Sequence, residues 1–345
     1  MATPAPLRRP GGGPGRDEQL RLMTKVARLY YEHGLNQPEI ARRLHVSQAR
    51  ISRLLKQAHE QGIVRTTVTV PDGVSTELED RLEELYGLRE AIVIECFETS
   101  EEGIAYDLGV ATAAYLESTL TGGDVVGVSS WSGTLLAAAD VMRPLARAGA
   151  DRVVQLVGGV GNPHAEAHAA HLTQRFAQLM RARPTFLLAP GIATSAQARA
   201  ALLKDQFIQE AISAWDEVTL ALVGIGALEP SSLLQSSGNI FSERELHALG
   251  QRGAVGDVCL RFFNAGGEPI ASDFDRRVIG VRLEQLKLVD RCVGVAGGER
   301  KHQAIHAALL GGWLNVLITD HVTADYLVAE HADAPAAPRN TRRSR

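Results

Sequence analysis

Polar and basic side chains gather on a short segment near the amino end, residues 47–56 (SQARISRLLK). In the major groove of DNA, an amide such as that of Gln48 can pair with adenine, and a guanidinium such as that of Arg50 can pair with guanine. The methyl group of Ala49 can contact that of thymine. Basic side chains beside such readers bind phosphates, which fix the register without reading the sequence. We therefore expect DNA contacts from Gln48, Ala49, Arg50, Ser52, Arg53, Lys56, Arg42 and Arg43.

The residues around this segment predict two short helices joined by a tight turn. Asn36 and Glu39 have the spacing of a capping box that opens the first helix, and Ser47 can cap the second. His45 stands at the turn, where the backbone often needs a positive φ. Apolar residues recur at helical spacing in both segments. This layout is typical of a helix-turn-helix that reads the major groove, whereas a helical hairpin with ordinary surface arginines is the less favoured interpretation.

Segments on either side would complete a winged-helix-like DNA-binding domain over residues 18–70. Residues 63–70 (IVRTTVTV) alternate apolar and polar as a short strand, which could form a wing with Arg65 near a phosphate. Residues 19–33 have the period of a helix. Its inward face would consist of Leu20, Met23, Val26, Ala27, Tyr30 and Tyr31.

A linker helix is expected over residues 71–88. Thr76 and Glu79 match a capping box, and leucines recur at helical spacing after them. A helix between a DNA reader and a second domain is a natural dimer contact. A helix that packs on the core of the second domain would have the same sequence pattern, so both interpretations stay open.

Length and composition limit the class of protein. The 345 residues suggest about two domains. A net charge of −4 means that DNA affinity must come from a local basic patch. Cys96, Cys259 and Cys292 lie far apart in apolar runs, which favours buried free thiols in a reducing cytoplasm. No signal peptide or membrane-spanning run is apparent, so we expect a cytoplasmic protein. The tails, residues 1–17 and 332–345, are expected to be disordered.

The large remaining segment, residues 89–331, alternates short apolar runs with helical patterns. Continuous apolar strands between helices predict an α/β domain with a mostly parallel sheet. The expected strands are 91–96, 124–129, 152–159, 184–190, 218–226, 254–262, 292–298 and 313–320. Glycine-rich loops lie at 129–134, 158–163, 189–191, 224–226, 253–257 and 296–298. Because ligands bind at the carboxyl ends of such strands, these loops predict one shared pocket, although tight turns would explain some of the glycines.

Taken together, these motifs resemble the SorC family of bacterial sugar-responsive transcription regulators. The resemblance is carried by residues 29–64, 155–163, 220–226, 253–263, 295–320 and 323–325. Two further segments, SSWSGTLLA (129–137) and SSGNIFS (236–242), resemble most closely the subgroup of erythritol-type polyol regulators. The resemblance implies a Rossmann-like α/β effector domain related to sugar-phosphate isomerases and glucosamine-phosphate deaminases. It also implies homodimers or homotetramers on palindromic double-stranded operator DNA.

The same resemblance implies an effector site built from several loops. Many members have a Gly-Arg-Thr loop that cradles phosphate, whereas this chain has Trp-Ser-Gly-Thr at 131–134. The missing arginine argues against a phosphorylated effector, and Trp131 could stack on a sugar or pack in the core. His168, on a predicted helix, could bond a polyol hydroxyl. The expected effector-binding set is Ser132, Gly133, Thr134, Gly158, Gly159, His168, Asp257 and Lys301.

Metal binding and catalysis are the competing interpretations. His164, His168 and His171 could share one helix face at metal-ligand spacing, but Glu166 falls between the histidines and no HExxH motif results. We favour an exposed or effector-contacting histidine, and we expect no metal or cofactor. An isomerase or deaminase needs a paired acid and base at the open sugar, for which only Asp257 and His168 are available.

The sequence therefore predicts a regulator and not an enzyme. It would bind the operator of a sugar or polyol catabolic operon, with an affinity set by a sugar, polyol or sugar-phosphate effector. Effector binding would shift the population of subunit arrangements and so change the spacing of paired recognition helices. An isomerase-like or deaminase-like enzyme that carries a DNA-binding module is the alternative.

Overall fold

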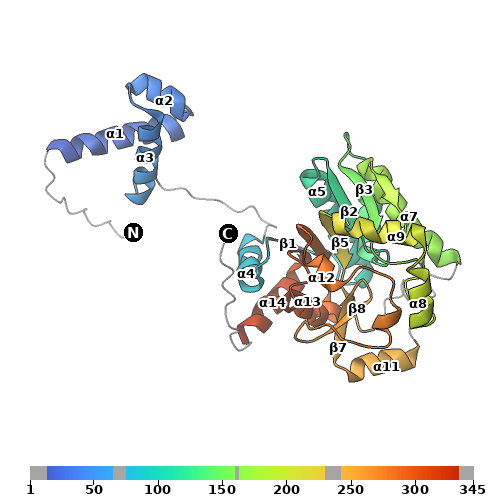
Figure 1. The fold of residues 1–345 in the computed structure, drawn as a ribbon. Helices are drawn as coiled ribbons and strands as arrows, with labels where there is room; N and C mark the ends of the chain where they lie inside the picture. The colour runs from blue at the N-terminus through green and yellow to red at the C-terminus, as the bar shows by residue number, and fades with distance from the viewer. Residues whose placement is uncertain (1–13, 65–74, 160–162, 230–241, 334–345) are drawn as a thin grey trace. The chain divides into compact units, whose positions relative to one another are not determined.

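The chain folds into two compact units that divide after Val70. The computed structural model describes residues 14–64, 75–159, 163–229 and 242–333. Each unit is described by itself below and is drawn in Figure 1.

The first unit contains the expected helix-turn-helix. Its three helices are α1 (Pro14–Tyr31), α2 (Gln37–Leu44) and α3 (Gln48–Glu60). Asn36 and Glu39 form the predicted capping box on α2, and the Ser47 hydroxyl accepts a hydrogen bond from the Arg50 amide at 3.3 Å. His45 adopts a φ of 55°, as its place in the turn predicts. A small apolar core holds the helices together and comprises Met23, Val26, Ala27, Leu29, Ile40, Ala41, Ile51, Leu54, Leu55 and Ala58.

Helix α1 differs from the prediction at both ends. It begins at Pro14, inside the tail predicted over residues 1–17, because a proline at the first helical position has no amide to leave unpaired. Leu20, Tyr30 and Tyr31, predicted to face inward, are exposed. Helices α2 and α3 have 8 and 13 residues against 18 in α1, so they cannot cover its whole length. The predicted wing over 63–70 lies mostly outside the described residues.

Helix α4 (Thr76–Tyr86), the expected linker helix, belongs to the second unit and packs within it. Leu82 is fully buried. The Glu79 carboxylate accepts a hydrogen bond from the Val93 amide at 2.9 Å, and that of Glu83 accepts one from Ala91 at 3.0 Å. The predicted capping box at Thr76 is therefore wrong, because Glu79 is used to pair an amide on the free edge of a strand. The core-packing interpretation of this segment holds.

The second unit is built on a seven-stranded parallel sheet. Its strands, in spatial order, are β1 (Glu90–Ile94), β10 (Val316–Asp320), β9 (Arg291–Val295), β5 (Leu220–Gly224), β2 (Asp124–Val128), β3 (Ala150–Gln155) and β4 (Arg183–Thr185). Alternate residues of these strands enter two separate apolar cores. Val126 and Leu222 belong to one core, while Val125 and Val223 belong to the other. The sheet is thus buried on both faces, as its apolar runs predict.

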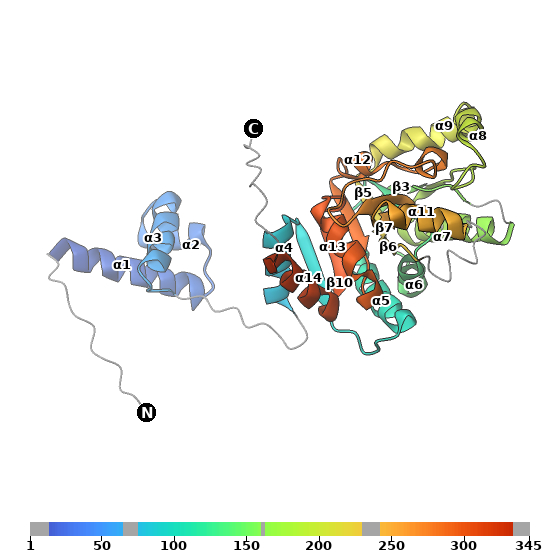
Figure 2. The same ribbon diagram turned by 90° about the horizontal axis from the view of Figure 1, so that it is seen from below.

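Helices cover the two faces. The core on one face includes residues of α5 (Glu101–Thr119), α6 (Gly133–Val141) and α7 (Pro163–Met180). The core on the other face includes residues of α4, α9 (Gln206–Ser213), α11 (Glu243–Gln251), α12 (Leu283–Leu286), α13 (His302–Leu310) and α14 (His321–Asp333). The remaining described helices of this unit are α8 (Ala196–Leu202) and the 3-10 helices η1 (Ala214–Glu217), η2 (Asp275–Arg277) and η3 (Glu299–Lys301). Figure 2 shows α5 and α6 along one side of the sheet and α9 and α12 along the other.

One of the strands predicted from the sequence forms two separate strands in the structure. Residues 254–262 were expected to form a single run, but β7 (Ala254–Val258) and β8 (Arg261–Asn264) form a hairpin, with β6 (Gly226–Ala227), in a small antiparallel sheet. Cys259 and Leu260 both have positive φ, 53° and 63°, and reverse the chain. Such turns usually contain glycine or asparagine, so an apolar Cys-Leu pair gives no turn signal in the sequence.

The left-handed backbone conformation of His45 leads to a testable prediction about the stability of the first unit. Replacing His45 with valine, whose branched side chain is strained at positive φ, should destabilise the α2–α3 pair by about 1–2 kcal/mol. His45→Gly should be tolerated. Amide hydrogen exchange of α2 and α3 in the full chain measures the effect. The control is His33→Val, since His33 is exposed and has a negative φ; equal protection in His45→Val and His33→Val would contradict the assignment.

Candidate functional site

The surface expected to contact DNA is formed by the second helix of the helix-turn-helix and the end of the first. All eight predicted residues are exposed, six on α3 and two in the last turn of α2. The Arg53 guanidinium bonds the Ala49 carbonyl at 3.3 Å, within its own helix. Arg50 and Gln48, in the first turn of α3, make no side-chain hydrogen bond within the described part of the chain, so both are available to base edges.

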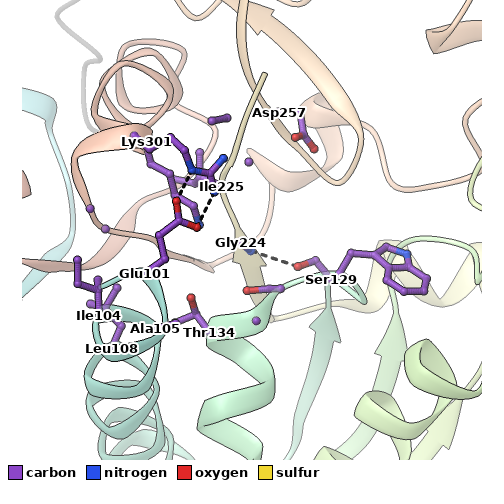
Figure 3. Close-up of a pocket in the computed structure, with 18 of the residues that line it drawn as sticks. Glu101, Ile104, Ala105, Leu108, Ser129, Thr134, Gly224, Ile225, Asp257 and Lys301 are labelled. Atoms are coloured by element: carbon purple, nitrogen blue, oxygen red, sulfur yellow. Dashed lines mark hydrogen bonds and ion pairs between the residues drawn. The ribbon is translucent and has the colours of Figure 1, made fainter. Parts of the chain in front are cut away.

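The second unit contains a cavity of about 450 Å³ at the carboxyl ends of its parallel strands. Strands β2, β3 and β4 follow one another toward one edge of the sheet, whereas β5 lies on the other side of β2. Open α/β sheets bind ligands at this reversal of strand order. The loops after β2 and β5 both line the cavity, together with the β7–β8 hairpin, the start of α5 and the η3 turn. The predicted shared pocket therefore lies at the topological switch point (Figure 3).

The loop after β2 brings hydroxyl groups and a helix start to the cavity. The Ser132 hydroxyl caps α6 by accepting from the Leu135 amide at 3.2 Å. The Ser129 hydroxyl accepts from the Gly224 amide at 3.1 Å, which joins the loops after β2 and β5. Thr134 is 5% exposed and lines the cavity, and its hydroxyl makes no hydrogen bond within the described residues. The positive end of α6 and a free hydroxyl thus line the cavity together.

A buried carboxylate and a lysine line the same cavity. Asp257 is 9% exposed, and its Oδ2 atom accepts from the Leu260 amide at 2.9 Å. Burial raises the pKa of Asp257 to about 6, although the Leu260 amide and the Lys301 ammonium oppose the shift. Burial also lowers the pKa of Lys301, and so does the neighbouring Arg300. Burial therefore disfavours the charged form of each group, and a ligand hydroxyl that hydrogen-bonds the charge is a favourable partner.

An ion pair stands at the edge of this cavity. Arg300 bonds Glu101 through Nε at 2.5 Å and through a terminal nitrogen at 3.1 Å. The remaining terminal nitrogen donates to the Glu229 carbonyl at 3.0 Å. In Figure 3, dashed lines from Glu101 mark this pair. The hydrogen bond from Arg300 lowers the pKa of Glu101, so the carboxylate stays ionised.

Five of the eight predicted effector residues line the cavity, namely Ser132, Gly133, Thr134, Asp257 and Lys301. Gly158 and Gly159 do not line it. A Cβ at Gly158 would lie 2.6 Å from the Ala189 carbonyl oxygen, and Gly159 pairs with Pro190 in a bridge. These glycines therefore hold the loops after β3 and β4 together.

The predicted histidine face is only partly described. His171 is exposed, whereas the side chains of His164 and His168 lie outside the described residues. In the part of the chain that the structure describes, no group of three histidine, cysteine or carboxylate side chains could hold a metal ion. The proposed contact from His168 to a polyol stays a prediction.

Sequence reasoning missed several residues of the cavity. Glu101 and Glu102 are the first two residues of α5 and follow no glycine-rich motif. Acidic residues are common at the start of a helix, so nothing in the sequence marks these two as part of a site. Arg300 stands beside Lys301 in the GGERK run and could have been found there. Trp131 lines the cavity and also packs against the apolar core, so both of its predicted roles are compatible with its position.

Comparison with known proteins agrees with this architecture. The family model "Putative sugar-binding domain" matches residues 73–329, and the model of sigma-70 region 4 matches residues 23–61. The deoxyribonucleoside regulator of Bacillus subtilis is 38% identical over 90% of this chain and 98% of its own length. The sorbitol operon regulator of Klebsiella pneumoniae is 29% identical over 90% and 98%. The chain belongs to the SorC/DeoR family of sugar-binding transcriptional regulators.

Solved structures of this family share the fold. The full-length sorbitol operon regulator SorC from Klebsiella pneumoniae has a TM-score of 0.67 at 28% identity, covering 90% of this chain and 99% of its own. The sugar-binding domain of the regulator DeoR from Pseudomonas syringae has a TM-score of 0.59 at 40% identity, covering 74% and 100%. These relatives are transcription regulators, and this SorC/DeoR-family chain is likewise a transcription regulator. None of the described helices is long and apolar enough to cross a membrane.

The buried Asp257 carboxyl predicts a pH-dependent stability change. An acid whose pKa is raised by folding weakens the fold once it ionises, so its cost is absent below about pH 4 and complete above about pH 6. Asp257→Asn should therefore stabilise the chain by about 1–3 kcal/mol at pH 8. The gain should shrink toward pH 5. Denaturant unfolding at both pH values measures it, with the exposed Asp290→Asn as control; a gain that is equal at both pH values would contradict the raised pKa.

Proposed function

We propose that this regulator binds a palindromic operator as a homodimer or homotetramer, and that its operator affinity falls or rises when a sugar, polyol or sugar-phosphate effector binds in the switch-point cavity. One observation carries the proposal: a cavity with a free threonine hydroxyl, a buried carboxylate and a lysine lies at the strand-order reversal of a chain that also bears an exposed basic α3. The similarity to a deoxyribonucleoside regulator and to a sorbitol operon regulator supports a sugar or polyol as the effector class.

The DNA contacts follow from the geometry of α3. Gln48, Ala49 and Arg50 occupy its first turn and would read base edges, since that end of a recognition helix enters the groove. The basic residues farther along α3 and at the end of α2 would bind phosphates. Because phosphate contacts release counterions, operator affinity should fall steeply with salt.

Effector control would act through a shift between subunit arrangements. A ligand changes an equilibrium only by its difference in affinity for the two states. The cavity joins the loops after β2 and β5 to the start of α5 and to the η3 turn, so a bound ligand would connect segments from both halves of the sheet. A subunit arrangement with a different distance between the two recognition helices would then fit the operator half-sites worse or better, and operator affinity would change. The loop sequence SSWSGT supports membership of the polyol-responsive subgroup.

Removing the proposed guanine reader tests the DNA interface. Arg50→Ala should cost about 1–3 kcal/mol of operator binding and relax the base preference at one position of each half-site. Fluorescence anisotropy with operator and base-substituted DNA measures both effects. Arg28→Ala is the matched control, because Arg28 is an exposed arginine on α1 already paired with Glu32 at 2.8 Å. Operator binding by Arg50→Ala that equals that of the control would remove Arg50 from the reading face.

Removing one cavity hydroxyl tests the effector site. Thr134→Val should abolish the response of operator binding to the effector while leaving the binding itself intact, because Thr134 is buried at the cavity and far in sequence from the DNA-binding unit. Thr134→Ser keeps the hydroxyl and should respond almost normally. The response is read as the change in operator affinity when candidate sugars are added. A normal response in Thr134→Val would move the effector site elsewhere.

A further inference from the structure

We propose that the effector of this regulator is an uncharged polyhydroxylated molecule, a polyol or free sugar, and not its phosphate ester. This inference rests on the proposed effector site and names the chemical class that it selects. It is carried by the charges that line the cavity and by the hydrogen bonds that those charges already make.

Carboxylates outnumber cations among the described residues of the cavity. Its acidic residues are Glu101, Glu102, Glu229, Asp257 and Glu299, and its basic residues are Arg300 and Lys301. Four of the five acids are exposed and Asp257 is buried. A phosphate ester, with close to two negative charges, would have to pass and remain near these carboxylates.

The arginine in the cavity is already engaged. Arg300 uses Nε and one terminal nitrogen on Glu101, and the other terminal nitrogen on the Glu229 carbonyl. The fork with which arginine holds phosphate is therefore occupied by a carboxylate of the same chain. A phosphate could bind Arg300 only by displacing Glu101, which would leave that carboxylate unpaired beside the incoming anion.

Lys301 is the remaining cation of the described lining, and acidic groups balance it. Glu101 and Asp257 line the same cavity as Lys301, and their negative charges oppose the larger lowering of the Lys301 pKa by burial. Asp257 is buried beside the cavity. A phosphate near Lys301 would therefore also lie near a carboxylate that has little solvent around it, which offsets the attraction of the ammonium.

A polyol fits the same groups without that conflict. Each hydroxyl both donates and accepts, so it can donate to a carboxylate and accept from an ammonium or amide. The Oδ1 atom of Asp257 and the hydroxyl of Thr134 make no hydrogen bond within the described residues, and the start of α6 supplies amides that can bind a hydroxyl oxygen. The α6 amides could also hold one phosphate oxygen, but a helix end offers only about half a positive charge. A volume of about 450 Å³ lies within the range of small-molecule sites.

The experiment compares matched pairs of ligands on the full chain. Isothermal titration calorimetry would be run with erythritol, ribitol and sorbitol, with the terminal monophosphate of each, and with inorganic phosphate. We expect at least one polyol to bind tenfold or more tightly than its own phosphate. Tighter binding of the phosphate in every pair, binding of inorganic phosphate alone, or binding of none of these compounds would overturn the proposal.

A charge variant tests the cause. Glu102→Gln combined with Glu299→Gln removes two cavity carboxylates that make no side-chain hydrogen bond in the described structure. In this variant the ratio of phosphate affinity to polyol affinity should rise at least threefold at low salt. Glu284→Gln, an exposed acid on α12 outside the cavity lining, is the control. An unchanged ratio of polyol to phosphate affinity in the double variant would contradict the electrostatic argument.

The outcome is separable from that of the proposed function. Operator binding is measured on its own by gel shift of the promoter region, without ligand and with each polyol. Failure to bind the operator would overturn the DNA-binding proposal and leave the calorimetric selectivity standing. Operator binding combined with a preference for phosphate esters would leave the regulator intact and overturn the ligand class alone.

Discussion

The reversal of strand order between β2 and β5 is the constraint on which the effector site depends. Because β3 and β5 flank β2, the loops that leave β2 and β5 diverge to opposite faces and leave a crevice between them. The hydrogen bond from the Gly224 amide to the Ser129 hydroxyl ties the two loops at the floor of this crevice. Thr134, on α6, follows β2 directly, whereas Asp257 and Lys301 reach the same cavity from β7 and from the η3 turn.

The charges of the site follow from burial. Asp257 lies near the end of β7, before a hairpin turn whose two central residues have positive φ, and its Oδ2 atom accepts a hydrogen bond from the Leu260 amide in that turn. Burial raises the pKa of Asp257, because an ionised carboxylate with little solvent around it lowers the stability of the fold unless a ligand hydrogen-bonds it. Asp257 lowers the stability of the free protein, and a ligand that hydrogen-bonds it would remove that cost. The ligand-bound state would therefore be more stable than the free state. This is a physical basis for a site that responds to occupancy.

Local sequence rules predicted the helix-turn-helix well and the large domain in part. The caps at Asn36 and Ser47 and the turn at His45 depend on residues close in sequence, so propensity alone suffices there. The β7–β8 hairpin could not be predicted, because Cys259 and Leu260 carry no turn signal. The capping box expected at Thr76 does not form, because the Glu79 carboxylate accepts a hydrogen bond from the Val93 amide of the edge strand, 14 residues away. Glu101 and Arg300 meet only in the folded chain, 199 residues apart, and no spacing rule reports such a pair.

The central claim is that occupancy of the switch-point cavity and operator binding are thermodynamically coupled. Coupling is reciprocal, so an effector that changes operator affinity by some factor must have its own affinity changed by the operator by the same factor. Calorimetric titration of the effector into the free chain and into the chain saturated with operator DNA measures this most directly. The account predicts two different dissociation constants, with a ratio equal to that of the operator affinities with and without effector. Identical constants in the two titrations would contradict it.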